Sequence, residues 1–237
     1  MIKNDPNLFY VNGSFEEHNP SWDSADSEWK AKLVTDAIRW NNLVPASIVE
    51  IGCGAGAILS SLRRHFPHTY LSGFDIAPGA AKFWAHHTDL SIEFTLGDFL
   101  EINSRRFDLL LMLDVIEHLA NPHDFLSRAA KHADHFLFHI PLDLSAASVL
   151  REQPLVQSRR KVGHIHYFTK RLALELLEEC GYEVVYVRFS GAYLRPRNTL
   201  GGKVANCIRW LVFSFNREVG VRLLGGDTLV VLARARI

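Results

Sequence analysis

The side chains best suited to chemistry in this sequence are carboxylates and imidazoles that fall in two short stretches. They are Asp114, Glu117, His118, His164 and His166. A neutral imidazole accepts a proton near pH 7 because its ordinary pKa is about 6.5. Imidazole nitrogens and carboxylate oxygens also bind divalent cations. These residue types therefore indicate either proton transfer or metal binding.

Three interpretations of this set stay open. In the first, a histidine is a general base, and Glu117, His118 and His164 form the catalytic group. In the second, Asp114, Glu117 and His118 bind a divalent cation together with His164 or His166. In the third, Glu117 and His118 only cap a short helix, and His164 orients a loop. The pattern commits to no metal, so the metal stays unassigned.

A glycine-rich stretch follows the apolar run at residues 47–51. Its residues Gly52, Cys53, Gly54 and Gly56 fit the pattern GxGxG. Glycine allows a sharp turn and a close approach of the backbone to a ligand, and a helix that starts there presents free N–H groups to an anion. The same stretch also fits a dinucleotide fingerprint or a simple tight turn. The loop therefore indicates a nucleotide-type ligand only in combination with other residues.

Acidic residues end or follow the next two apolar runs. Asp75 lies 23 residues beyond Gly52, where a carboxylate can accept hydrogen bonds from both ribose hydroxyls. Asp98 offers an acceptor for an adenine amino group, and Phe99 offers a ring that can lie against the base. Together with the glycine-rich stretch, these residues favour a nucleoside-containing ligand.

Apolar runs typical of buried strands alternate with amphipathic stretches that predict helices. The expected strands are residues 47–51, 70–75, 91–96, 107–113, 135–140, 182–189 and 228–235. The expected helices are residues 24–42, 56–66, 121–131 and 169–180, with a further one near Pro78. Continuous apolar strands alternating with helices indicate a mostly parallel sheet covered on both faces. We therefore expect a doubly wound α/β fold that binds ligands beyond the carboxyl ends of its strands.

The chain is expected to form a single domain over residues 1–237. A helical cap covers residues 1–45, and a cofactor-binding core covers residues 46–189. Residues 190–226 form an insertion between the last two strands, and residues 227–237 contain the last strand.

The insertion contains an amphipathic helical pattern. Its apolar face consists of Val204, Ile208, Leu211, Val212 and Phe215, and Lys203, Arg209, Arg217 and Arg222 lie nearby. Such a pattern is typical of a helix that packs on its own domain. A basic amphipathic helix also fits peripheral membrane contact, here through residues 200–217.

Composition disfavours several classes of protein. Twenty-six Lys and Arg balance 26 Asp and Glu, so no net charge favours a nucleic acid, and no nucleic-acid partner is expected. The cysteines Cys53, Cys180 and Cys207 lack CxxC spacing, which disfavours a disulfide framework or a zinc ribbon. The sequence shows no signal-peptide pattern and no apolar run of membrane-spanning length. A cytoplasmic protein is expected, and the oligomeric state is left open.

Four motifs in register resemble the class I S-adenosylmethionine-dependent methyltransferases. They are VEIGCGAG, GFDIAP, LGDF and FDLLLMLDVIEHLANP, and the resemblance runs from about residue 29 to residue 189. The DVIEHL motif is similar to that of the ubiquinone-type O-methyltransferases. The resemblance implies a seven-stranded sheet whose last strand is antiparallel, with S-adenosylmethionine as the cofactor.

The resemblance also implies roles for individual residues. Glu50 shapes the glycine loop beside the methionine part of the cofactor, Asp75 binds the ribose, and Asp98 and Phe99 contact the adenine. The residues implied in cofactor binding are Glu50, Gly52, Cys53, Gly54, Gly56, Asp75, Ile76, Asp98, Phe99 and Asp114. The DxxEH spacing with a distant histidine is similar to the ExxEH…H metal motif of small-RNA 2′-O-methyltransferases. Asp114 departs from that motif, because its side chain is shorter than glutamate.

The expected function is O-methylation of a hydroxyl on a small molecule, a lipid-linked precursor or a glycan. A nicotinamide-dependent oxidoreductase is an alternative that uses the glycine loop and Asp75 but leaves LGDF and DVIEHL unexplained. A non-catalytic binding module with the same fold is a second alternative.

Overall fold

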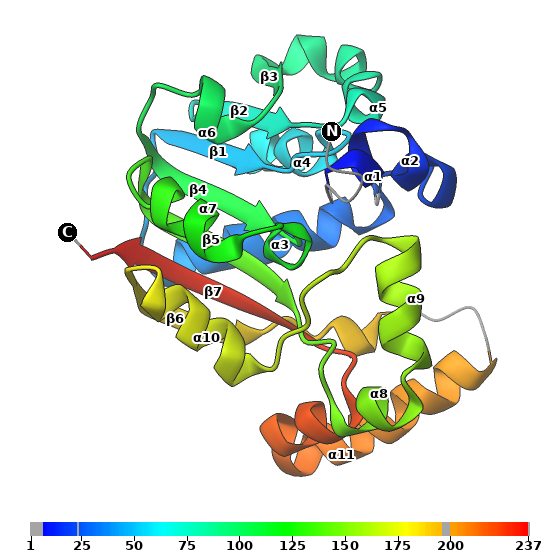
Figure 1. Ribbon diagram of the computed structural model, residues 1–237. Helices are drawn as coiled ribbons and strands as arrows, with labels where there is room; N and C mark the ends of the chain where they lie inside the picture. Colours follow the sequence, from blue (N-terminus) through cyan, green and yellow to red (C-terminus); the bar gives the residue numbers. More distant parts are fainter. Residues whose placement is uncertain (1–6, 23, 196–199, 237) are drawn as a thin grey trace.

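A sheet of seven strands forms the centre of the computed structural model, which describes residues 7–22, 24–195 and 200–236 (Figure 1). The strands are β1 (Ser47–Ile51), β2 (Tyr70–Asp75), β3 (Ile92–Leu96), β4 (Phe107–Leu113), β5 (Ala133–Pro141), β6 (Tyr182–Phe189) and β7 (Thr228–Ala235). Their order is β3-β2-β1-β4-β5-β7-β6. The first five are parallel, and β7 runs antiparallel to both of its neighbours. The predicted α/β sheet with an antiparallel last strand is confirmed.

Helices cover both faces of the sheet. On one face, α3 (Ser27–Trp40) and α4 (Ala57–His65) pack against alternate residues of β4 such as Leu109 and Leu111. On the other face, α6 (Phe99–Ile102), α7 (Pro122–Ala129) and α10 (Lys170–Glu179) pack against Leu110 and Met112. Because successive side chains of a strand point to opposite faces, the apolar run of β4 contributes to both cores.

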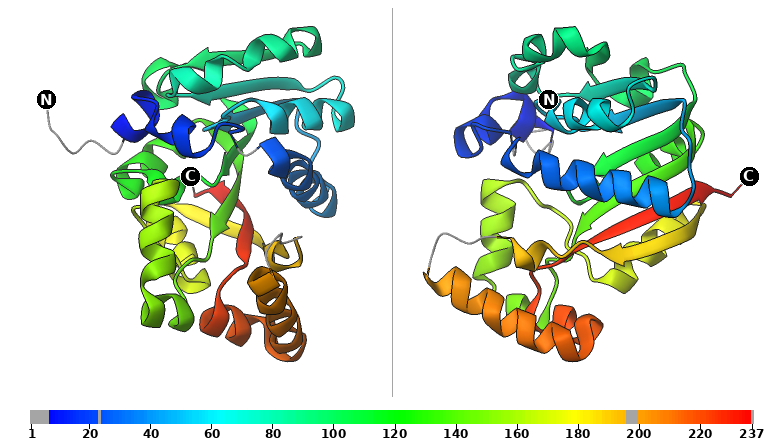
Figure 2. Two further views of the ribbon diagram at one scale, coloured as in Figure 1. Left: turned by 90° about the vertical axis from the view of Figure 1, so that its right-hand side faces the viewer. Right: turned by 180° about the vertical axis from the view of Figure 1, so that it is seen from behind.

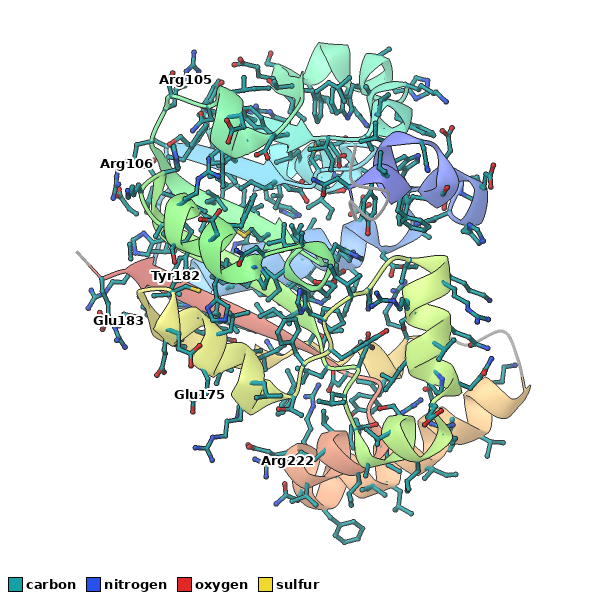
Figure 3. The ribbon with its side chains drawn as sticks, in the orientation of Figure 1. Arg105, Arg106, Glu175, Tyr182, Glu183 and Arg222 are labelled. Atoms are coloured by element: carbon teal, nitrogen blue, oxygen red, sulfur yellow. The ribbon has the colours of Figure 1, made fainter. Side chains whose placement is uncertain are left out.

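The remaining helical segments lie at the edges and at the carboxyl ends of the parallel strands. They are α1 (Leu8–Val11), α2 (Ser14–His18), α5 (Pro78–Ala81), α8 (Ala146–Arg151), α9 (Gln153–Lys161) and α11 (Leu200–Leu224), with short 3₁₀ turns at Ser24–Asp26, Trp84–Leu90, Ile116–His118 and Ala192–Leu194. The helix expected over residues 24–42 begins as one of these turns and continues as α3. In Figure 3, Arg105 and Arg106 mark the opposite end of the sheet, where β4 begins.

Helices α8, α9 and α11 form a lobe at the bottom of Figures 1 and 2. Helix α11 is interrupted at Asn216, whose backbone is extended (φ −155°, ψ 102°). Its expected apolar face is divided between two environments. Val212 packs against the core, as does its neighbour Phe213, which is not part of this face. Val204, Ile208, Leu211 and Phe215 are more than half exposed. Helix α11 therefore contacts the core, but four of the five residues expected on this face point away from it.

The arginines of α11 that face the domain explain this orientation. Arg217 pairs with Asp227, 2.7 Å from Nη2 to Oδ2, and Asp227 is buried directly before β7. Arg209 donates from Nε to the carbonyl oxygen of Gly225, at 3.0 Å. Two of the four basic side chains expected near the apolar face, Arg209 and Arg217, therefore bind α11 to the rest of the fold. Among the residues that the structure describes, no helix is long and apolar enough to cross a membrane.

Candidate active site

A cavity of about 820 Å³ lies at the carboxyl ends of β1, β2, β4 and β5. That volume is typical of a pocket for a cofactor-sized ligand. Most of the residues expected at a site line it: Glu50, Gly52, Cys53, Gly54, Asp75, Ile76, Asp98, Phe99, Asp114, His118 and His164. Three of the expected residues do not line it: Gly56, Glu117 and His166.

The glycine loop turns sharply between β1 and α4. Gly52, Gly54 and Gly56 all have positive φ angles (+70°, +51° and +78°), which L side chains rarely adopt. A Cβ on Gly52 would lie 2.8 Å from the side chain of Val115, and one on Gly56 would lie 2.6 Å from the ring of Phe94. Gly56 thus serves close packing behind the loop, while Gly52 and Gly54 face the cavity.

Asp75 links the glycine loop to the end of β2. Its Oδ2 accepts a hydrogen bond from the backbone N–H of Gly54 and its Oδ1 from that of Ala77, each at 2.8 Å. Burial raises the pKa of this carboxyl, and the two N–H donors counteract the rise. Asp98 similarly caps α6 by accepting from the N–H of Leu100 at 2.8 Å, and the buried ring of Phe99 meets Phe74 edge to face.

Asp114 does not join the other candidate metal ligands. Its backbone is left-handed (φ +57°), and its N–H donates to the carbonyl oxygen of His139. Its carboxylate pairs with Lys30 at 2.7 Å and with Nδ1 of His139 at 2.6 Å. These two partners hold the pKa of Asp114 well below its usual range. The four-ligand set that included Asp114 is therefore wrong, because the turn after β4 directs this side chain toward α3 and β5.

Tyr10 of α1 orients His118. Its hydroxyl oxygen lies 2.7 Å from Nδ1 of His118 and 3.0 Å from the carbonyl oxygen of Val162. Because a carbonyl only accepts, both contacts are satisfied when Tyr10 donates to Val162 and accepts from Nδ1–H of His118. That tautomer leaves the lone pair on Nε2 of His118, which lies 3.8 Å from Oε1 of Glu117.

Asp143 orients His164 in the same way. Its Oδ2 lies 2.6 Å from Nδ1 of His164, and this nitrogen carries the hydrogen because a carboxylate accepts. The lone pair then lies on Nε2, which is 3.9 Å from Oε1 of Glu117. His166, the other histidine considered, instead contacts the carbonyl oxygen of Leu119 at 3.0 Å through Nε2. Of the two histidines, His164 is therefore the one beside Glu117.

Glu117 lies fully buried between these two imidazoles. Neither of its carboxylate oxygens has a hydrogen-bond partner among the described residues, so the interpretation that it caps a helix is wrong. Burial raises its pKa well above the usual range, and the charge of Asp114 raises it further. Burial and the neighbouring His164 lower the pKa of His118 to about 4. One ligand atom each from Glu117, His118 and His164 lie within 4.8 Å of one another, so three electron-pair donors converge.

Comparison with known proteins decides the family. A family model described as a methyltransferase domain matches residues 22–187 of this chain. The chain belongs to this methyltransferase family. The four motifs that suggested the resemblance lie within the matched segment, and the family match favours the methyltransferase prediction over a nicotinamide oxidoreductase.

Individual relatives match shorter segments of this chain. It is 36% identical over 90 residues to the ubiquinone biosynthesis O-methyltransferase of Maricaulis maris, covering 35% of each chain. It is 26% identical over 90 residues to the malonyl-[acyl-carrier protein] O-methyltransferase of Hahella chejuensis, covering 37% of this chain and 32% of the relative. The chain thus spans about a third of the length of these two curated relatives.

The fold is similar to that of solved methyltransferases. The plantazolicin methyltransferase BpumL, in complex with SAH, aligns over 98% of this chain and 94% of its own, with 15% identity and a TM-score of 0.65. This likeness extends over nearly the whole chain, and it concerns the fold alone.

Two polar residues of the site were missed by sequence reasoning. Lys30 lies on the inward face of α3, and His139 lies near the carboxyl end of β5, where both pair with Asp114. A histidine inside the otherwise apolar run of β5 is a signal that could have identified the second residue. Lys30 gave no comparable signal, because lysines on helices are usually solvated.

Proposed function

We propose that this methyltransferase transfers the methyl group of S-adenosylmethionine to a hydroxyl oxygen held beside Glu117, His118 and His164. The observation that carries the proposal is the convergence of a buried carboxylate and two oriented imidazoles at the wall of a cofactor-sized cavity. Three groups that all present lone pairs cannot hydrogen-bond to one another, but they can bind a cation together. The acceptor is a small molecule or a lipid-linked one, in line with the O-methyltransferase relatives.

Residues at the glycine-loop side fit the cofactor. Glu50 is buried, lines the cavity, and its Oε2 has no hydrogen-bond partner among the described residues. An ammonium group, such as that of the methionine part, would satisfy this oxygen. Asp75 would accept from the ribose hydroxyls, and Asp98 and Phe99 would contact the adenine. Asp114 and Lys30 would lie near the sulfonium end.

The residues Glu117, His118 and His164 fit a divalent cation. One carboxylate and two imidazoles are a common donor set for zinc and related metals. Each imidazole is oriented by the hydrogen bond that its Nδ1–H donates, from His118 to Tyr10 and from His164 to Asp143. A bound cation would supply the chemistry that a hydroxyl acceptor needs, which is a lower pKa of the acceptor oxygen. The low pKa of His118 disfavours the alternative in which this residue acts alone as a general base, because a group with a pKa of about 4 is a weak base near neutral pH.

The chain's own residues would then position the acceptor and exclude water. Tyr10, Trp29 and Arg195 also line the cavity. The guanidinium of Arg195 pairs with Asp26 and lies 5.0 Å from the centre of the Trp29 ring. Methyl transfer from a sulfonium depends on in-line alignment, which a rigid wall of this kind provides. Cytoplasmic location stays part of the proposal.

Calorimetric titration tests the metal site directly. We expect Zn²⁺ or Mn²⁺ to bind the EDTA-treated protein with one ion per chain, and His164→Ala to abolish that binding. His166→Ala is the matched control, because His166 lies two residues away and outside the cluster. Equal metal binding by wild type and His164→Ala would overturn the assignment, whereas SAH binding without metal would still support the cofactor site.

The ribose contact predicts a loss of cofactor affinity. Asp75→Ala is expected to weaken SAH binding by about 1.5–3 kcal/mol, which corresponds to roughly 10–150-fold in Kd, because a charged hydrogen-bond partner is removed. Asp134→Ala, at the exposed amino end of β5, is the control. Calorimetry on the folded variants measures the change, and an unaltered Kd would show that the ribose lies elsewhere.

A further inference from the structure

Charge is distributed unevenly over the fold although its total is zero. The lobe of α8, α9 and α11, taken as residues 145–170 and 200–225, holds nine Lys and Arg but only two Asp and Glu. The rest of the chain therefore holds 17 basic and 24 acidic residues. The exposed basic side chains of the lobe are Arg151, Arg159, Arg160, Lys161, Lys203 and Arg222. Figure 3 shows Arg222 on α11, and Glu175 and Glu183 on α10 and β6 outside the lobe.

The same lobe exposes large apolar side chains. Phe215 of α11 and Leu150 of α8 are each 86% exposed, and Trp210 is 57% exposed. Ile208 and Leu211 lie on the same outer side of α11. Helices α8 and α11 pack against each other, so the exposed apolar side chains of both belong to the same lobe.

The inward-facing arginines of α11 show that the fold itself holds this apolar face toward the outside. Arg217 and Arg209 bind Asp227 and the carbonyl oxygen of Gly225, which fixes the rotation of α11 about its axis. Phe213 and Val221 complete the inward face. The apolar outer face is therefore what the fold presents to its surroundings.

We infer that the α8–α9–α11 lobe docks on the surface of an anionic lipid bilayer. Aromatic and aliphatic side chains flanked by Lys and Arg are suited to the boundary between acyl chains and anionic headgroups. Each basic residue near such a surface adds electrostatic attraction to the anionic headgroups. A second copy of the chain is a poorer occupant, because symmetric pairing would bring two basic lobes together.

This inference goes beyond the proposed methyl transfer and does not depend on it. If both hold, docking would bring the acceptor side of the cavity close to the lipid. His164 and Val162 follow α9 directly, and the carbonyl oxygen of Arg195 accepts a hydrogen bond from Asn206 of α11. A lipid-linked acceptor would then reach the cavity from the bilayer.

Vesicle sedimentation with the full chain tests the apolar contribution. We expect binding to equimolar phosphatidylglycerol–phosphatidylcholine vesicles and a loss of about 10-fold or more in Ile208→Ser/Phe215→Ser, because each side chain would bury apolar area in the membrane. Ile102→Ser on α6 is the control, since Ile102 is 53% exposed and Ile208 is 51% exposed. Vesicle binding of the double variant equal to that of wild type would overturn the inference.

Charge reversal tests the electrostatic contribution. Arg160→Glu/Lys161→Glu should weaken binding to the anionic vesicles, as should added salt, whereas Arg39→Glu/Arg236→Glu outside the lobe should have little effect. Equal binding to pure phosphatidylcholine would contradict the anionic preference.

Sedimentation equilibrium of the protein alone tests whether a second copy covers the surface instead. A dimer that dissociates in Ile208→Ser/Phe215→Ser would assign the surface to a second copy and overturn the inference. SAH affinity, measured in parallel, separates this result from any failure of the proposed methyl transfer.

Discussion

Glu117→Gln is expected to reduce kcat by about 10²–10⁴-fold while leaving SAH affinity unchanged. The substitution keeps the shape of the side chain but removes the negative charge that would hold a cation between His118 and His164. Because Glu117 does not line the cavity, the cofactor contacts stay intact. Steady-state kinetics with a hydroxyl acceptor and calorimetry with SAH measure the two effects separately.

The same substitution should stabilise the metal-free fold. A fully buried carboxylate without a hydrogen-bond partner costs free energy when ionised, so its neutral replacement should raise the free energy of unfolding by about 1–3 kcal/mol in EDTA. Glu175→Gln on the exposed side of α10 is the control (Figure 3). An active Glu117→Gln variant, or one destabilised in EDTA, would contradict the assignment of a cation site.

Glu50→Gln is expected to remove the contribution of this carboxyl to the pH dependence of stability between about pH 4.5 and 8 in the ligand-free protein. Burial raises the pKa of Glu50 to about 8, with the charge of Asp75 adding to the rise and Lys30 opposing it. The folded chain therefore keeps this proton in a range where the unfolded chain releases it. Stability from this group is fully present below pH 4.5 and is lost as pH rises through 8, by an amount on the order of 4 kcal/mol.

Urea unfolding at a series of pH values measures this difference between wild type and Glu50→Gln. The comparison cancels other titrating groups, including His118, whose lowered pKa acts in the opposite sense by reducing stability as pH falls. Glu183→Gln, an exposed pair with Arg234, is the control. Parallel curves for wild type and Glu50→Gln would show that Glu50 is ionised in the fold.

The strands could be predicted from the sequence because each is a continuous apolar run bounded by polar residues. Six of the seven match their expected bounds to within one residue at each end, and β5 extends further, to Ala133 and Pro141. The glycine loop and Asp75 could be placed because the loop follows β1 and Asp75 ends β2, and these two strands are parallel neighbours. The carboxyl ends of neighbouring parallel strands meet at one edge of the sheet, so the positions of the strands in the sequence are enough to bring these residues together.

The rest of the site depends on contacts between distant segments. Asp114 and Glu117 are three residues apart, yet the left-handed backbone at Asp114 sends one carboxylate to Lys30 and leaves the other beside His164. No local pattern encodes those partners. The rotation of α11 was missed for the same reason, because Asp227 determines it from outside the helix.

The position of β7 has a consequence for the order in which the chain folds. Within the described sheet, β6 is hydrogen-bonded only to β7, which lies between it and β5. During synthesis, β6 must therefore remain without a strand partner until α11 and β7 have emerged from the ribosome, while β1 to β5 can already pair. Synthesis therefore passes through a transient intermediate in which the edge of β5 and the whole of β6 have unpaired backbone N–H and C=O groups. This is the stage at which binding by a chaperone would be most useful.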